Sequence, residues 1–136
     1  MLVHNTYTSL KDIYFALRSS RSITWCFCPN ANLYIENRLP KVEMFQFHDF
    51  NITLGTDSLA SNKSLCILSE IKTLHQNFPS LSLTETIAWG TLNGAKFLGI
   101  DDTFGSIEKG KKPGLNLITN NKGLKLTPES KVQKLV

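Results

Sequence analysis

The sequence lacks several features that would place it in other classes of protein. It has 136 residues and no apolar run of about 18, so we expect no membrane-spanning helix and no membrane partner. Its first residues show no charged segment followed by an apolar stretch and a small-residue cleavage site, which indicates no secretory signal. Three cysteines are too few, and odd in number, for a disulfide framework. These absences predict a cytoplasmic domain that is long enough to bury a core.

Ligands for a transition metal are also scarce. The chain has 3 histidines, at positions 4, 48 and 75, and no two of them form an H-x-H pair. Cys26 and Cys28 are spaced C-x-C in a strand-like run, but no second pair completes a zinc site, so buried thiols are the interpretation we favour. Because a catalytic zinc or iron site usually takes three protein ligands, the sequence offers no evident complete set.

Positive charge is in excess, with a net charge of +4. The lysines are densest at residues 109–112 and 122–134, without interleaved aromatic residues or a nucleic-acid motif. A solvated face is therefore the interpretation we favour, and no nucleic-acid partner is expected. If the chain were instead a small independent α/β binding domain, these lysines would be its binding surface.

Strand and helix patterns alternate along the first part of the chain. Apolar, β-branched and aromatic residues predict three short strands, near residues 2–4, 23–28 and 52–55. Apolar residues at helical spacing predict helices from Ser9, after Pro40, over 63–77 and over 82–98. Residues 30–34 are expected to form a loop. Alternation of this kind is typical of α/β folds, in which parallel strands are covered by helices.

The last part of the chain differs in texture. From about residue 104, short apolar stretches alternate with turns rich in glycine and asparagine, which predicts a small β-rich piece. We therefore divide the chain into residues 1–103 and residues 104–136.

Two details of the helix expected over 82–98 can be tested in a structure. Ser82 and Glu85 have the spacing of a capping box, in which each side chain bonds the other's backbone N–H. Gly90 and Gly94 lie four residues apart, which suggests close packing against another element.

Polar residues follow the expected strands at the points where each one ends. His4 follows the first strand, Asn30 and Asn32 follow the second, and Asp57 follows the third. An isolated aspartate after Gly-Thr is more typical of a turn or helix cap. Because the carboxyl ends of parallel strands open on one edge, where α/β folds place their chemistry, we expect these side chains to converge there.

Four segments give the chain a family resemblance. Residues 3–5, 28–33, 54–58 with 60–62, and 105–111 read Val-His-Asn, Cys-Pro-Asn-Ala-Asn-Leu, Leu-Gly-Thr-Asp-Ser with Ala-Ser-Asn, and Gly-Ser-Ile-Glu-Lys-Gly-Lys. In this order the chain resembles the C-terminal part of the metal-dependent amidohydrolase superfamily, in the branch that contains guanine deaminase, cytosine deaminase and triazine hydrolases. The resemblance implies the end of a (β/α)8 TIM-type barrel, about strands six to eight, followed by a segment of the flanking β-sandwich.

The resemblance also implies roles for individual residues. Asp57 would bind the metal, accept a proton from the metal-activated water and pass it to the leaving amine. His4 would polarise the substrate or stabilise the tetrahedral intermediate by a hydrogen bond. Asn30 and Asn32 would shape the substrate-facing loop. The expected function is therefore hydrolysis of a non-peptide carbon–nitrogen bond in a small molecule, namely deamination of a cyclic amine with zinc or iron.

Two consequences remain open at this stage. Because the family's H-x-H and strand-five histidine have no counterpart here, we expect a C-terminal fragment that binds no catalytic metal and is inactive alone. The alternative is a non-catalytic association module that pairs through its open sheet edge with itself, as a homo-oligomer, or with a separate N-terminal half.

Overall fold

A three-stranded parallel sheet organises the computed structural model, which describes residues 1–20, 22–48 and 50–136. Its strands are β1 (Leu2–Val3), β2 (Thr24–Phe27) and β3 (Asn51–Leu54), in that spatial order. Trp25 of the central strand pairs with Leu2 on one side and with Ile52 on the other. The predicted alternation of strands and helices, and the parallel pairing that it implies, are therefore confirmed.

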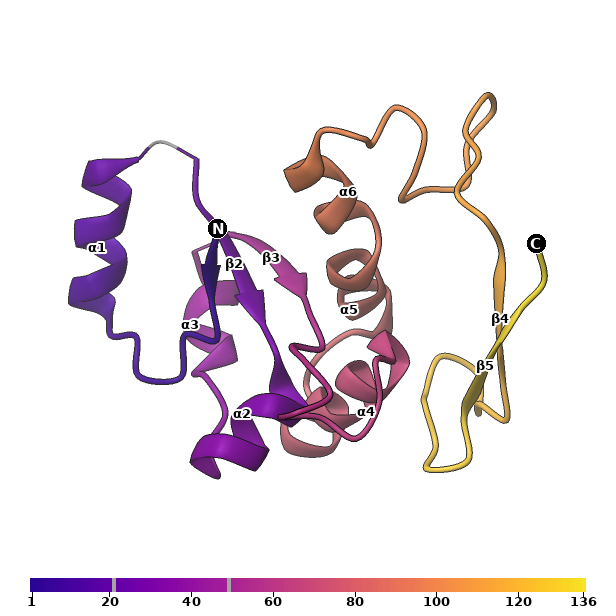
Figure 1. The fold of residues 1–136 in the computed structure, drawn as a ribbon, viewed down its shortest axis with the longest axis horizontal. Helices are drawn as coiled ribbons and strands as arrows, with labels where there is room; N and C mark the ends of the chain where they lie inside the picture. The colour runs from indigo at the N-terminus through magenta and orange to yellow at the C-terminus, as the bar shows by residue number, and fades with distance from the viewer. Residues whose placement is uncertain (21, 49) are drawn as a thin grey trace.

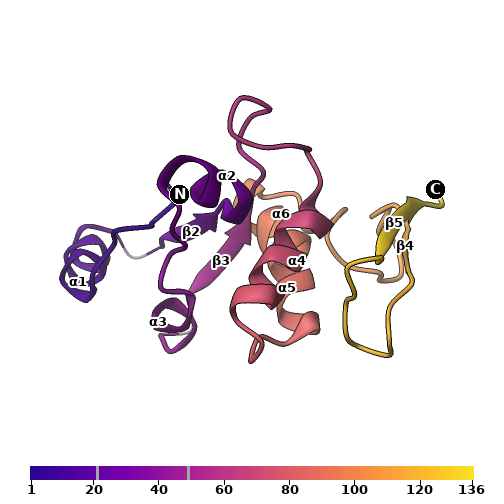
Figure 2. The ribbon, with the colours of Figure 1, turned by 90° about the horizontal axis from the view of Figure 1, so that it is seen from below.

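Helices connect the strands and follow them. The chain runs through α1 (Leu10–Ser19) between β1 and β2, and through α2 (Pro29–Glu36) and α3 (Val42–Gln46) between β2 and β3. It then forms α4 (Ile67–Asn77), α5 (Leu83–Gly90) and α6 (Leu92–Leu98). Figures 1 and 2 show α1 beside β1 at one end of the sheet and the α4–α6 group beyond β3 at the other. Among the described residues, no helix has the length and apolarity to cross a membrane.

One face of the sheet carries an aromatic core. Trp25 and Phe27 point from β2 to this face, and the ring of Phe45 on α3 lies 5.1 Å from each of them. Phe27 and Phe45 are fully buried and Trp25 is 1% exposed. Aromatic side chains bury large apolar areas, so this face supplies much of the driving force for folding. Other members of the cluster are Ile13, Val42, Ile52, Leu74, Leu81 and Trp89.

The opposite face is lined by small and polar side chains. Cys26 and Cys28 are free, buried thiols, which confirms the structural interpretation of the C-x-C pair. Gly55 follows β3 beside them, and a Cβ at this position would lie 3.1 Å from the sulfur of Cys26 and 3.3 Å from that of Cys28. This face therefore leaves little room for added side-chain volume next to the thiols.

The prediction of a loop over residues 30–34 is wrong, because these residues lie in α2. Pro29 does end β2, but it also begins the helix as its first residue, where a missing N–H is harmless and the fixed φ angle suits helical geometry. Asn37 ends the helix in the left-handed region, with φ of 49°. The two amides are therefore carried by a rigid first turn.

The helix expected over residues 82–98 is interrupted near Thr91, where α5 ends and α6 begins. The capping box also fails, because Ser82 makes no side-chain cap and the carboxylate of Glu85 instead accepts both contacts from Gln46 Nε2, at 2.9 Å. The carboxylate of Glu85 therefore bonds a residue distant in sequence, Gln46, in place of the backbone N–H of Ser82. A Cβ on Gly90 would lie 2.7 Å from Ile67 Cγ2, which confirms close packing there, whereas one on Gly94 would meet no atom within 4 Å.

The C-terminal part forms an antiparallel pair, β4 (Asn116–Thr119) and β5 (Lys131–Lys134). Both views place it beyond α4–α6, away from the three-stranded sheet (Figures 1 and 2). Lys72 Nζ on α4 donates to the carbonyl of Ser130 at 3.2 Å and so ties the hairpin to the helices. The expected β-rich texture is present, and the division at residues 103 and 104 stays a prediction.

Candidate functional site

The carboxyl ends of the three strands lie side by side. The N–H of His4 donates to the Cys26 carbonyl at 2.9 Å, and the N–H of Gly55 donates to the Phe27 carbonyl at 2.9 Å. These bonds continue the pairing past the end of β1 and β3. Residue 4 and the turn that leads to Asp57 therefore leave the same edge of the sheet, on either side of β2.

His4 is held in an unusual conformation. Its φ angle is 70° and that of Asn5 is 60°, in the left-handed region that non-glycine residues adopt at a cost. The side chain of Asn5 donates to the carbonyls of Leu2 and Cys26, at 3.0 and 3.3 Å. These bonds hold the backbone of residues 4 and 5 in this conformation, just past the end of β1.

Asn32 fixes the ring of His4. Its Nδ2 donates to the His4 carbonyl at 3.2 Å and to Thr6 Oγ1 at 2.7 Å, and its Oδ1 lies 2.9 Å from His4 Nδ1. Because a carbonyl can only accept, the amide orientation is settled and Oδ1 faces the ring. We infer that Nδ1 carries the proton. A neutral imidazole then keeps its lone pair on Nε2, the arrangement that prepares a histidine to bind a metal or accept a proton.

Asp57 lies on an exposed turn with φ of 56°. Its Oδ2 accepts a hydrogen bond of 2.6 Å from Ser61 Oγ, and Ser61 also donates to the Ser58 carbonyl at 3.3 Å. The next helix begins only at Ile67, with Cys66 at its N-cap position. Asp57 therefore does not cap a helix, and the turn presents its carboxylate at the strand edge.

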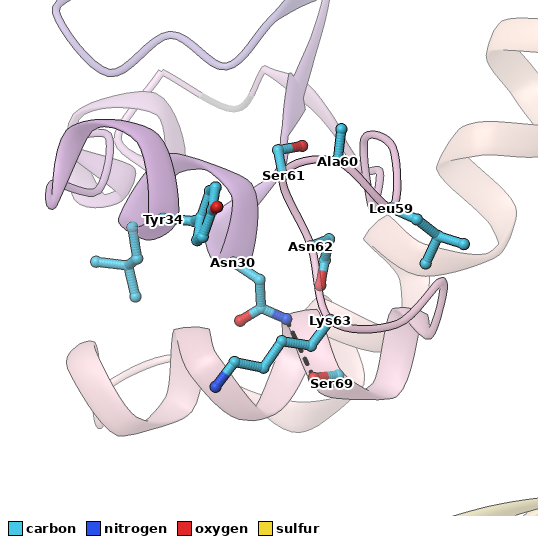
Figure 3. Close-up of a pocket in the computed structure, with 9 residues that line it drawn as sticks. Asn30, Tyr34, Leu59, Ala60, Ser61, Asn62, Lys63 and Ser69 are labelled. Atoms are coloured by element: carbon cyan, nitrogen blue, oxygen red, sulfur yellow. Dashed lines mark hydrogen bonds between the residues drawn. The ribbon is translucent and has the colours of Figure 1, made fainter.

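The two asparagines of α2 point in different directions. Asn30 donates from Nδ2 to Ser69 Oγ at 3.1 Å and to Glu70 Oε1 at 2.9 Å, so its amide faces α4 while that of Asn32 faces His4. Asn30 also lines a cavity of about 580 Å³ between α2, the segment 59–63 and α4 (Figure 3). Substrate contact by either asparagine stays a prediction. The polar groups of Asn32 are already used within the protein.

The pKa values of the two buried thiols depend on neighbouring groups. The hydrogen bond with Cys26 is the main cause that raises the pKa of Cys28, followed by burial and by the negative charges of Asp57 and Glu70. The same hydrogen bond lowers the pKa of Cys26. Asp57 and Glu70 are thus close enough to Cys28 for their charges to disfavour its thiolate form.

The sequence interpretation missed Glu70, which is fully buried on α4. Burial raises its pKa, and hydrogen bonds from Asn30 and Asn62 partly oppose this effect. One sequence signal was available, because Glu70 falls at helical spacing between Ile67 and Leu74, on the apolar face of its helix. An acidic residue on such a face needs polar partners inside the protein.

As a metal ligand, Asp57 offers a carboxylate oxygen, which zinc and iron accept. Within residues 1–20, 22–48 and 50–136, no group of three or more His, Cys, Asp or Glu side chains is placed to hold a metal ion. The residues present thus fit part of a ligand set.

Comparisons with known proteins agree on one family. The model of the family described as "Amidohydrolase family" matches residues 1–135. A 5-methylthioadenosine/S-adenosylhomocysteine deaminase of Teredinibacter turnerae is 32% identical over 126 residues, which cover 88% of this chain and 28% of that protein. The chain thus spans less than a third of this relative's length.

Solved structures give the same result. An adenosine deaminase from Xanthomonas campestris, with bound zinc, is similar with a TM-score of 0.72 and 31% identity, over 85% of this chain and 28% of that one. Guanine deaminase of E. coli is similar with a TM-score of 0.68 and 26% identity, over 82% and 26%. These relatives are deaminases by name, and the fold that they share with this chain is a mixed α/β one.

Proposed function

Because the chain belongs to the amidohydrolase family, we propose that it supplies Asp57 and His4 to a hydrolytic deaminase that acts on a cyclic amine. We assign β1, β2 and β3 to strands six, seven and eight of the family's barrel, and the β4–β5 pair to its flanking sandwich. The observation that carries the proposal is the common strand edge from which His4 and Asp57 both project. The names of the relatives support an adenosine-type or guanine-type amine as the first substrate class to examine.

The proposed chemistry adds water across a carbon–nitrogen bond and releases ammonia. A zinc or iron ion, when bound, lowers the pKa of the attacking water. Asp57, on its exposed turn, accepts the proton that this water loses and returns it to the leaving amine. His4, with Nδ1–H held by Asn32, directs Nε2 toward the reacting centre. In its protonated form it would donate a hydrogen bond from Nε2 to the tetrahedral intermediate that forms when the water adds.

A second candidate is association with another polypeptide or a second copy of the chain. It is favoured by the exposure of apolar side chains on β1 and α1, where Val3 is 48% exposed, Tyr14 54% and Phe15 75%. Within the described residues, β1 pairs on one side only. Sedimentation of the purified chain tests pairing with a second copy, because a monodisperse monomer contradicts self-association.

The activity is tested in the natural polypeptide that carries these residues. We expect it to retain zinc or iron and to release ammonia from a panel of purine nucleosides and bases. Asp57→Asn should lower ammonia release by about 10³-fold or more, because it removes the group that moves the proton. Asp102→Asn changes an exposed aspartate and serves as the matched control. Full activity and metal content in Asp57→Asn would contradict the proposal.

A further inference from the structure

Glu70 is a buried carboxylate whose partners in the described residues are all amide N–H groups. Its side chain is fully buried on α4. Oε2 accepts from the backbone N–H of Asn30 at 2.8 Å, and Oε1 accepts from Asn30 Nδ2 at 2.9 Å and from Asn62 Nδ2 at 2.7 Å. A buried charge is costly unless it is well hydrogen-bonded, so these three bonds are what makes the ionised form tolerable.

This set of donors requires a carboxylate. The backbone N–H of Asn30 cannot be reversed, and Asn62 Nδ2 is held by its second bond, to the Thr56 carbonyl at 2.7 Å. A glutamine at position 70 would point its own N–H groups at one of these donors. A hydrophobic residue would leave the backbone N–H of Asn30 unsatisfied and would remove one bond from each of the two side-chain amides.

The bonds of Glu70 lead to both candidate catalytic residues. In one direction, Asn62 joins Glu70 to the carbonyl of Thr56, the residue directly before Asp57. In the other direction, Glu70 holds the first N–H of α2, and the same turn carries Asn32, which contacts the ring of His4. The turn after β2 and the turn after β3 are thus joined through one side chain.

We propose that Glu70 is a positioning residue that holds the Asp57 turn and the start of α2 in a fixed mutual arrangement. Through Asn62 it sets the backbone from which the Asp57 carboxylate projects. Through Asn30 it sets the helix that orients His4. The inference rests on the proposed function for the roles of Asp57 and His4, whereas the mechanical link itself does not.

The link is tested by hydrogen exchange on the natural polypeptide, with Glu70→Gln as the main variant. We expect amide exchange to rise by about 10-fold in residues 29–33 and 55–63, the scale of losing one charged hydrogen bond, with little change in α5 and β4. Asn62→Ala breaks only one branch, so exchange should rise in 55–63 and not in 29–33. Glu70→Asp keeps the charge and should recover part of the protection.

The matched control is Glu85→Gln, which changes a carboxylate that accepts hydrogen bonds away from the sheet edge. Unchanged exchange in both segments of Glu70→Gln, or an equal rise in every segment, overturns the proposal, because the second result means a general loss of stability. If Glu70→Gln does not fold, Asn62→Ala decides, and equal exchange in its two segments overturns the proposal.

Kinetics separate this inference from the proposed function. If both hold, Glu70→Gln lowers kcat for ammonia release by about 10–100-fold with little change in KM, as expected for a residue that orients a metal ligand. If Asp57→Asn leaves activity intact while amide exchange in Glu70→Gln rises as described, the proposed function fails and the mechanical link stands.

Discussion

The two faces of the central strand are built from opposite kinds of side chain. On one face, Trp25 and Phe27 pack against Phe45 in a buried aromatic cluster. On the other, Cys26 and Cys28 lie against Gly55, with Thr53 beside them. The residues alternate along one strand, as the period of two in a β-strand requires. The strand therefore separates a face that stabilises the fold from a face that leads to the candidate site.

Hydrogen bonding differs between the faces as well. The aromatic face relies on packing, whereas the candidate site relies on buried polar side chains that make several hydrogen bonds, such as Asn32 with three and Glu70 with three. Thr53 is an exception on this face, because its buried hydroxyl has no hydrogen-bond partner among the described residues. Left-handed φ angles occur at His4 and Asp57, at the ends of the strands, and not within them. The comparison suggests that substitutions on the first face change stability, and those on the second change the geometry of the site.

The largest effect on stability is expected for Phe45→Ala. Phe45 is fully buried and contacts both aromatic residues of β2, so its removal leaves a cavity and should lower the free energy of unfolding by about 3–5 kcal/mol. Denaturant unfolding measures this loss. Phe47→Ala, two residues away at a position that is 87% exposed, is the matched control and should change it by less than about 0.5 kcal/mol. Equal losses in both variants would contradict the assignment of the core to this face.

The second effect is expected for Asn32→Ala on the other face. Losing the bond to His4 Nδ1 frees the ring and its tautomer, which should lower kcat/KM of the proposed deaminase by about 10–100-fold. The His4 ring nitrogens, followed by NMR, should shift from a single Nδ1–H tautomer to a mixture. Asn32→Asp keeps an acceptor toward Nδ1 and should recover part of the activity.

Asn77→Ala provides the comparison for this prediction. It changes an exposed asparagine near the end of α4 and should leave both the tautomer and kcat/KM unchanged. A fixed Nδ1–H tautomer in Asn32→Ala would show that Asn32 does not orient His4.

The sequence predicts the sheet well because its signals are local. All three strands are short stretches rich in apolar residues, β2 and β3 end close to a proline and a glycine, and the placement of polar residues at one edge follows from parallel pairing alone. Three of the four segments that carry the confirmed family resemblance, at 3–5, 28–33 and 54–58, lie at the ends of these strands. These features require no knowledge of distant contacts.

Features that depend on distant partners were not predictable. Glu85 has the spacing of a capping box, but its carboxylate bonds Gln46, which is 39 residues away in sequence. Asn30 has the appearance of a loop amide, but it lies in the first turn of α2 and bonds a carboxylate 40 residues away. In both cases a tertiary hydrogen bond replaces the local one that the sequence suggests. Glu70 was missed for the same reason, since its role exists only once α2 and α4 lie together.

The smallest effect concerns a histidine in the helical layer over the aromatic face. Partial burial lowers the pKa of His75 below its usual 6.5, and its Nε2 lies 2.9 Å from Thr86 Oγ1. A lowered pKa means that the unfolded chain binds the proton more readily, so His75 contributes stability that is present above pH 6.5 and lost as the pH falls through the folded-state pKa. His75→Gln keeps a partner for Thr86 and removes the titration. The slope of unfolding free energy below pH 6.5 should therefore be shallower in His75→Gln than in the parent, and equal slopes would show that this layer does not sense pH through His75.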